Sequence, residues 1–262
     1  MKPQYILILI LTTIVYNING YSQCGAGYNS GTRKTPKNST INVCVWNGSN
    51  ADISISTSNA IKNAALDYWG DDPKFECIGN ATSKYNCHAY AWHISEGGDQ
   101  VWINTPNDDK YWNDGSYVET TNESEAIKVS YGDCNTCATI VCWDPYNLKF
   151  YSCTRCGSLC DHSAITTTDN GYFISKWGAF PLFKHHKNDM PYLIQPGGLR
   201  YFKRCEDNYS GQLSSNIQSV CNVLLTNVTI QNNVNIEFKD WIKINGTFNV
   251  PAGTTLNISP NY

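Results

Sequence analysis

Twelve cysteines in a chain of 262 residues constrain its fold more than any other feature of the sequence. In an oxidising compartment cysteines pair by default, so this count predicts a framework of disulfides. The even number also bears on catalysis, because one free thiol leaves an odd remainder and requires a second unpaired cysteine. Six cysteines crowd into one segment: Cys134, Cys137, Cys142, Cys153, Cys156 and Cys160. The others are scattered: Cys24, Cys44, Cys77, Cys87, Cys205 and Cys221.

The N-terminus predicts export. Lys2 is followed by an almost wholly apolar stretch over residues 6–15, and Gly20 and Ser22 are small residues suited to a cleavage site. We interpret residues 1–22 as a signal peptide, because a membrane anchor needs about 18 or more apolar residues. The expected product is a secreted or cell-surface protein with no membrane span.

Composition argues against a nucleic acid partner. Only 16% of the residues are charged, with 19 Lys and Arg against 22 Asp and Glu. Removal of the signal peptide takes away one lysine and no acidic residue, which leaves a net charge of −4. A chain with this balance has no cationic excess to neutralise phosphates.

Periodicity predicts a mixture of helices and strands. Residues 60–69 have helical apolar spacing closed by Gly70, and residues 87–95 predict a shorter helix. Asp169-Asn170-Gly171 predicts a hairpin turn, because Asn-Gly readily takes positive φ. Strands are expected at residues 100–104, 126–131, 139–143, 162–168 and 172–177.

The composition changes after Tyr209. A polar stretch over residues 210–215 predicts a linker, and short apolar alternations broken by Asn, Gly and Pro continue from Leu224 to Ile258. We therefore expect a main domain over residues 23–209 and a small all-β C-terminal module over residues 210–262.

One constellation suggests nucleophilic catalysis. Asn86 can cap a helix that begins at Cys87, where the helix dipole and free N–H groups favour a thiolate and an oxyanion. His162 opens an expected strand and can serve as a base. The competing interpretations are a disulfide between Cys87 and Cys77 or another of the scattered cysteines, and a capping or surface role for His162.

Four motifs resemble papain-like cysteine amidases and peptidases of the NlpC and CHAP kind. They are Tyr-Asn-Cys-His-Ala-Tyr-Ala-Trp at residues 85–92, Tyr-Gly-Asp at 131–133, Asp-His-Ser-Ala-Ile at 161–165 and Ile-Ser-Lys-Trp-Gly at 174–178. The resemblance implies an α+β papain-like domain with a cysteine-rich insertion over residues 133–161. It also implies that Cys87 is the nucleophile and His162 the general base of an amide hydrolase acting on peptidoglycan-like peptides. Neither a metal nor a cofactor is expected. The 75 residues between Cys87 and His162 exceed the usual spacing of the family.

Several residues are candidates for the third member of the catalytic triad. The orienting group must accept a hydrogen bond from the imidazole, which a charged Lys176 cannot do. Ser175 fits the position and His185 fits the chemistry, with His186 as its rival; we favour His185. The candidates for contact with the substrate are Tyr85, Trp92 and Trp177.

The cysteine-rich segment has two interpretations. Cys134-x2-Cys137 and Cys153-x2-Cys156 are separated by 15 residues, a spacing that fits a four-cysteine zinc ribbon. Outside the cell, three local disulfides among the six cysteines are the expected outcome.

The C-terminal residues resemble short β modules of exported Bacteroidetes proteins, in phrases such as Val-Pro-Ala-Gly-Thr at 250–254. This resemblance implies attachment at a cell surface. The alternative to an enzyme is a secreted, non-catalytic binding or adhesion protein stapled by disulfides. In that case aromatic residues would line a glycan or peptide groove, among them Trp92, Trp102, Tyr111, Trp112 and Trp177.

Overall fold

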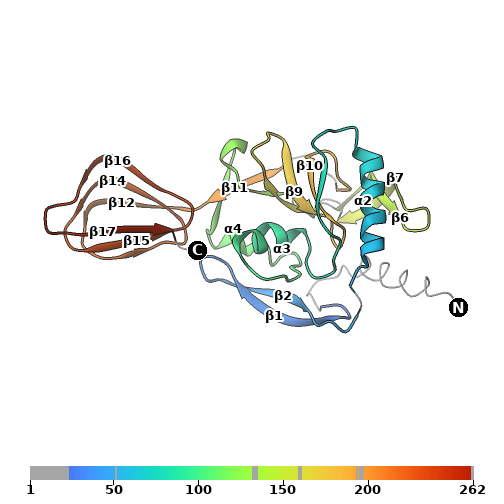
Figure 1. Cartoon of the computed structure of the whole chain (residues 1–262), viewed down its shortest axis with the longest axis horizontal. Helices are drawn as coiled ribbons and strands as arrows, with labels where there is room; N and C mark the ends of the chain where they lie inside the picture. Colours follow the sequence, from blue (N-terminus) through green and yellow to red (C-terminus); the bar gives the residue numbers. More distant parts are fainter. Residues whose placement is uncertain are drawn as a thin grey trace. The chain divides into compact units, whose positions relative to one another are not determined.

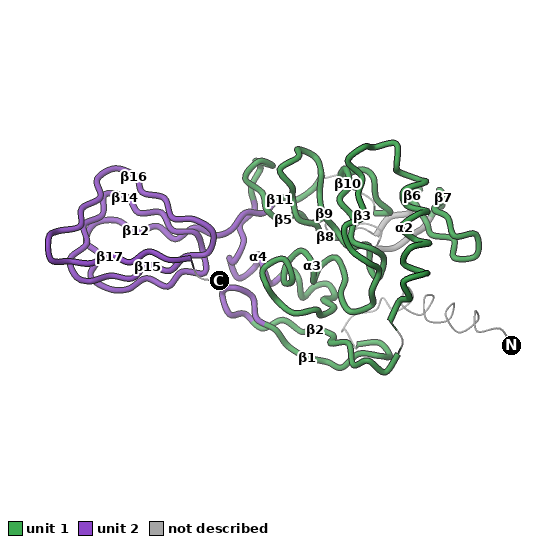
Figure 2. Tube along the Cα trace, in the orientation of Figure 1, with its two compact units in different colours: residues 1–33, 40–109, 120–201 green, residues 34–39, 110–119, 202–262 purple. Residues whose placement is uncertain are grey.

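A computed structural model describes residues 24–50, 52–131, 135–158, 161–192, 194 and 198–260 of the chain. The chain divides into two compact units, drawn in different colours in Figure 2. Unit 1 comprises residues 1–33, 40–109 and 120–201, and unit 2 comprises residues 34–39, 110–119 and 202–262. The expected signal peptide lies outside the described residues. Within the described part, no helix has the length and apolar character needed to cross a bilayer.

The described elements are predominantly strands (Figure 1). The helices are α2 (Ile55–Trp69), α3 (Cys87–Trp92) and α4 (Lys110–Asn113), with 3-10 turns η1 (Ile94–Glu96) and η2 (Glu123–Glu125). The strands up to the cysteine-rich segment are β1 (Tyr28–Lys34), β2 (Thr40–Trp46), β3 (Glu76–Gly79), β4 (Tyr117–Thr120) and β5 (Lys128–Ser130). Those that follow are β6 (Asn135–Asp144), β7 (Lys149–Ser158), β8 (Ser163–Thr166), β9 (Tyr172–Lys176), β10 (Leu182–His186) and β11 (Arg200–Arg204).

A seven-stranded sheet with the order β3-β10-β9-β8-β5-β11-β4 forms the framework of the site. The expected α+β papain-like class is wrong, because multiple sheets and few helices make the protein predominantly β. The motifs behind that expectation are short and local, whereas fold class depends on pairing between distant strands.

Helix α2 confirms the helix expected over residues 60–69 and begins earlier, at Ile55. Ser54 caps it, with its hydroxyl accepting the N–H of Thr57 at 3.1 Å. The buried face is built from apolar residues at helical spacing, including Ile61, Ala65 and Trp69. The chain approaches itself so closely at Gly70 that a Cβ there would collide with the carbonyl oxygen of Leu66.

Aromatic rings fill the core beneath α2. Trp69 stacks on Phe75 with ring centroids 5.8 Å apart, and the Trp177 ring lies 4.9 Å from that of Trp69. Phe150 of β7 enters the same cluster, 5.0 Å from Trp69. The β6–β7 hairpin is therefore packed into the core of unit 1 through Phe150.

The cysteine-rich segment is this antiparallel hairpin. Cys142 and Cys153 form a disulfide within it. Cys153 is one of the four cysteines of the zinc interpretation, so this disulfide rules out that zinc ribbon. The side chains of Cys134, Cys137, Cys156 and Cys160 lie outside the described residues, so their expected disulfides stay a prediction. Hairpin β1–β2, which has too little apolar periodicity to be predicted, carries a second disulfide between Cys24 and Cys44.

Unit 2 is dominated by a parallel β-solenoid. Its strands are β12 (Glu206–Leu213), β13 (Ile217–Gln218), β14 (Asn222–Ile230), β15 (Val234–Phe238), β16 (Ile242–Asn249) and β17 (Leu256–Pro260). The chain alternates between two parallel sheets, β12-β14-β16 and β13-β15-β17. Residues 210–213, expected in a linker, lie within β12 instead.

The same backbone conformations and asparagine hydrogen bonds recur from turn to turn of the solenoid. Positive φ angles at Gly211 and Asn227 fall where the register of the parallel strands shifts. Asparagine side chains join successive turns: Asn216 accepts the N–H of Asn235, whose side chain accepts from Asn257. A disulfide between Cys205 and Cys221 closes the first turn.

Candidate functional site

Cys87 is a free thiol at the first position of α3. Its side chain is buried, with 4% exposure. Asn86 caps the helix as expected, and its side-chain oxygen accepts the N–H of Ala89 at 3.1 Å. The same side chain bonds the backbone of Ile103 through both of its polar atoms. The first turn of α3 is thus held rigidly against the chain around Ile103.

The other free thiol among the described cysteines is Cys77, on β3. It is partly buried and donates to the carbonyl oxygen of Gly79. Cys77 and Cys87 are therefore not joined in a disulfide. Among the cysteines whose side chains are described, Cys77 and Cys87 are the two unpaired thiols, and the sequence did not indicate which cysteine accompanies Cys87.

His162 immediately precedes β8 and is buried, with 1% exposure. Neither of its ring nitrogens has a hydrogen-bond partner among the described residues. The ring lies between Tyr131, at a centroid distance of 4.9 Å, and Tyr192, at 4.0 Å and nearly parallel. Burial lowers the pKa of His162 well below its usual value, and His185 and His88 lower it further. The imidazole is consequently neutral near pH 7 and able to accept a proton.

Several contacts bring Cys87 and His162 to the same place. Helix α3 packs on β8 and β9. The residues next to them in sequence, His88 and Asp161, form an ion pair at 3.1 Å. Tyr192 stacks on His162, and the pKa of Tyr192 is raised first by burial and then by Cys87. The sulfur itself is not hydrogen-bonded to either ring nitrogen of His162.

His88 lies between two carboxylates. Its Nδ1 is 2.9 Å from Oδ2 of Asp108, and its Nε2 is 3.1 Å from Oδ1 of Asp161. Nδ1 also lies 2.9 Å from Oγ of Ser163, which accepts the indole N–H of Trp92. Burial alone lowers the pKa of His88, but Asp108, Cys87 and Asp161 together raise it well above its usual value. His88 is therefore an imidazolium.

Among the described residues, His88, Asp108 and Asp161 are also the group closest to a set of metal ligands. Their arrangement fits hydrogen bonding better than coordination. Each nitrogen of His88 faces a different carboxylate at hydrogen-bond distance, and one metal ion cannot occupy both positions.

Lys176, at the end of β9, is a buried amine close to the thiol. It donates to the carbonyl oxygens of Thr82 and Phe180. Burial lowers the pKa of Lys176 to about 7, and Asp52 and then Cys87 oppose that shift. A fraction of this amine is therefore cationic near the sulfur at neutral pH.

The structure does not join His185 to His162 by a hydrogen bond. Nδ1 of His185 lies 2.8 Å from the carbonyl oxygen of His186, so it carries the proton and donates. Its Nε2 lies 2.7 Å from Oγ of Ser175, which in turn accepts the indole N–H of Trp177. Both nitrogens of His185 are thus committed elsewhere, and the orienting role expected of it stays a prediction.

The three aromatic residues expected to contact substrate differ in placement. Trp92 is fully buried and Trp177 is 3% exposed, so both rings are part of the core. Tyr85 is partly exposed, stacks near Tyr90, and lies 5.0 Å from the Lys176 amine. Only Tyr85 of these three reaches the surface near the thiol.

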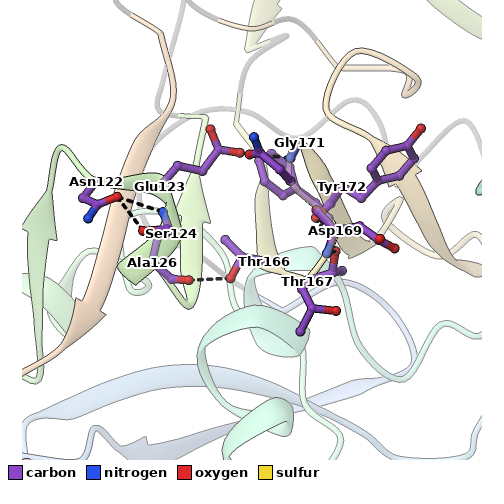
Figure 3. Close-up of a pocket in the computed structure, with 12 residues that line it drawn as sticks. Asn122, Glu123, Ser124, Ala126, Thr166, Thr167, Asp169, Gly171 and Tyr172 are labelled. Carbon is purple, nitrogen blue, oxygen red and sulfur yellow. Dashed lines mark hydrogen bonds between the residues drawn. The ribbon is translucent and has the colours of Figure 1, made fainter.

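A cavity of about 490 Å³ lies at the opposite end of the β8–β9 hairpin, over its turn (Figure 3). Its carboxylates are already engaged. Glu123 accepts from the N–H of Gly171 and from the hydroxyl of Tyr201. Asp169 pairs with Lys74 and with Lys184. With neither a cysteine nor a histidine among its lining residues, this cavity is a poorer candidate for chemistry than the surroundings of Cys87.

A family model described as a domain of unknown function (DUF7689) matches residues 76–193. This stretch contains Cys87, His88, Asp108, Asp161 and His162, and it is less than half of the chain. No curated protein and no solved structure matches the sequence. The expected membership of the NlpC and CHAP kind is therefore wrong, since neither the comparisons nor the predominantly β structure supports it. The likeness of the tail to Bacteroidetes modules finds no match either.

Sequence reasoning missed the carboxylates of the site. Asp108 follows a loop with no periodicity, so nothing local indicated that it meets His88. Asp161 offered a signal, because it precedes His162 directly just as His88 follows Cys87.

Proposed function

We propose that the chain is a cysteine-dependent amide hydrolase in which Cys87 is the nucleophile and His162 the general base. One observation carries the proposal. A buried imidazole, neither of whose nitrogens has a hydrogen-bond partner among the residues that the structure describes, lies in the same packed cluster as a buried free thiol. Buried polar atoms are normally hydrogen-bonded, and exceptions of this kind concentrate where chemistry occurs.

The neutral imidazole suits the first step. His162 accepts the thiol proton, and the Cys87 sulfur attacks the carbonyl carbon of the substrate amide. The imidazolium then protonates the departing amine, and a thioester is left on Cys87. Water, deprotonated by His162, hydrolyses the thioester and restores the thiol. Because thiolate and imidazolium form together, the net charge of the buried site does not change in the first step.

Two cations lie near Cys87. Lys176 supplies partial positive charge, and His88 supplies a full positive charge one residue away in sequence. In the proposed mechanism these charges stabilise the negative sulfur that forms when His162 accepts the thiol proton. The missing hydrogen bond between Cys87 and His162 is compatible with catalysis, since such contacts often tighten only when substrate binds.

The three described disulfides support a protein that folds in an oxidising environment. Export through residues 1–22 is part of the proposal. The peptidoglycan-like substrate and the surface attachment were implied by resemblance alone and stay predictions.

The test measures release of amines from a panel of peptides, cell-wall peptides among them, by the disulfide-intact protein. We expect Cys87→Ala to abolish release. Cys77→Ser removes the other described free thiol and should retain the wild-type rate. Equal rates for wild type and Cys87→Ala would leave the alternative, a non-catalytic binding protein.

A further inference from the structure

The side chain of His88 joins three segments of unit 1. Its Nδ1 meets Asp108 in the loop before α4, and its Nε2 meets Asp161 just before β8. His88 and Asp108 are both nine-tenths or more buried, whereas the side chain of Asp161 is 29% exposed. To donate at both nitrogens the ring has to carry two protons, so the contacts are charge-assisted.

A second layer of hydrogen bonds fixes Asp161 and His88, whereas Oδ1 of Asp108 has no hydrogen-bond partner among the described residues. The hydroxyl of Thr105 lies 2.8 Å and 2.9 Å from the two oxygens of Asp161. Ser163, the first residue of β8, adds a contact to Nδ1 of His88 at 2.9 Å. The first turn of α3 is thereby tied to the start of β8 by bonds of defined direction. The titratable groups facing His88 are Asp108, Cys87, Asp161, His162 and Tyr192.

We propose that His88, clamped by Asp108 and Asp161, is a positioning residue that sets the Cys87 sulfur against the His162 ring. This inference rests on the proposed function, because the proposed mechanism needs the Cys87 sulfur close to the His162 ring. His88 follows Cys87 directly and Asp161 precedes His162 directly, so the pair at 3.1 Å fixes the separation of the two backbone segments that carry the reacting groups. His88 does not itself exchange a proton with substrate.

The first variant is Asp161→Asn, which keeps the size of the side chain and removes its charge. The matched control is Asp169→Asn, which removes another ion-paired carboxylate at the far turn of the β8–β9 hairpin. We expect Asp161→Asn to lower kcat by about 100-fold, the scale of a displacement of roughly 1 Å, with KM little changed. Asp161→Glu should recover part of the loss, and Asp169→Asn should match wild type.

A second readout separates positioning from simple stability. The rate of Cys87 alkylation by iodoacetamide is measured from pH 5 to 9 on protein shown by circular dichroism to be folded. In wild type, proton transfer to His162 should make alkylation at low pH faster than in His162→Gln. In Asp161→Asn the profile should coincide with that of His162→Gln, which a purely structural role would not produce.

The outcomes separate the positioning role of His88 from the proposed hydrolase activity. A wild-type alkylation profile in folded Asp161→Asn overturns the clamp. If Asp161→Asn does not fold, Thr105→Val replaces it; a lower alkylation rate at low pH supports the clamp, and an unchanged profile overturns it. If the wild-type protein hydrolyses no amide but its alkylation profile depends on both His162 and Asp161, the clamp stands and the proposed function fails.

Discussion

His88 and His162 lie close together but differ in charge state, and their neighbours explain the difference. His88 has a carboxylate at each ring nitrogen and stays protonated. His162 has aromatic rings on its faces and, within the described part of the chain, no hydrogen-bond partner at either nitrogen, and it stays neutral. Environment, rather than residue type, therefore assigns the positioning group and the base.

The buried neutral imidazoles predict that acid destabilises the protein. The folded-state pKa of His162 is depressed, and burial lowers that of His185 to about 4. Each contributes stability above the unfolded pKa of about 6.5 and loses it as pH falls below that value, at up to about 1.4 kcal/mol per pH unit. His88 has a raised pKa, so its contribution is fully present below about pH 6.5 and is lost only as pH rises through the raised value.

Urea unfolding between pH 6.5 and pH 5 measures this slope, above the range in which the carboxylates titrate. His185→Gln should flatten the slope, and His186→Gln, at a partly exposed position, should leave it unchanged. A free energy of unfolding that stays constant over this range in wild type would contradict the assigned charge states.

Helix α2 and the β8–β9 hairpin show what could be predicted from local sequence. Apolar residues at helical spacing located α2, and Asn170-Gly171 located the turn, where Gly171 has a φ of 77°. The expected strand over residues 100–104 is reduced to a single bridge between Cys44 and Trp102. The β1 and β12 strands escaped notice because they are largely exposed and polar. The fold class failed for a different reason, since the order of strands in a sheet depends on contacts between residues far apart in the chain.

Phe150 is the buried ring of the β6–β7 hairpin within the core, against which Val141 and Trp143 also pack. Phe150 is 5% exposed and contacts both Trp143 and Trp69. Phe150→Ala should lower the free energy of unfolding by about 3–5 kcal/mol, because it leaves a cavity among aromatic rings. Its neighbour Tyr151 is 41% exposed, so Tyr151→Ala should change stability by less than about 0.5 kcal/mol. Similar losses for both variants, measured by urea unfolding, would show that the hairpin is not anchored in this way.

The first turn of the solenoid is closed by the disulfide between Cys205 and Cys221, which are 16 residues apart. A loop of this size restricts the unfolded chain by about 3 kcal/mol. The double variant Cys205→Ser, Cys221→Ser should therefore unfold at lower denaturant, with the loss seen in hydrogen exchange of β12 and β14. Unchanged exchange in these strands would contradict this role of the disulfide.

At the scale of the whole molecule, the cysteines whose side chains are described divide into three stapling pairs and two thiols. The crosslinks found by peptide mapping of unreduced, alkylated protein should include Cys24–Cys44, Cys142–Cys153 and Cys205–Cys221. Cys77 and Cys87 should carry the alkylating label once the protein is unfolded. A crosslink between Cys77 and Cys87 would show that Cys87 is not available as the nucleophile.

The candidate site shows the same division between local and distant information. Cys87 and His162 could be selected from their flanking residues, and the thiol proved to be free. The clamp could not, because Asp108 and Asp161 meet His88 only after three separate segments fold together.

Acid-quench mass spectrometry tests directly whether Cys87 forms a covalent intermediate with the substrate. A peptide that the protein cleaves is mixed with it, the mixture is quenched in acid within milliseconds, and the digest is mapped. We expect the fragment containing Cys87 to gain the mass of the acyl half of the substrate. Cys87→Ala should neither gain this mass nor release the amine. Amine release by Cys87→Ala at the wild-type rate, or an acyl group found on a different residue, would contradict this role of Cys87.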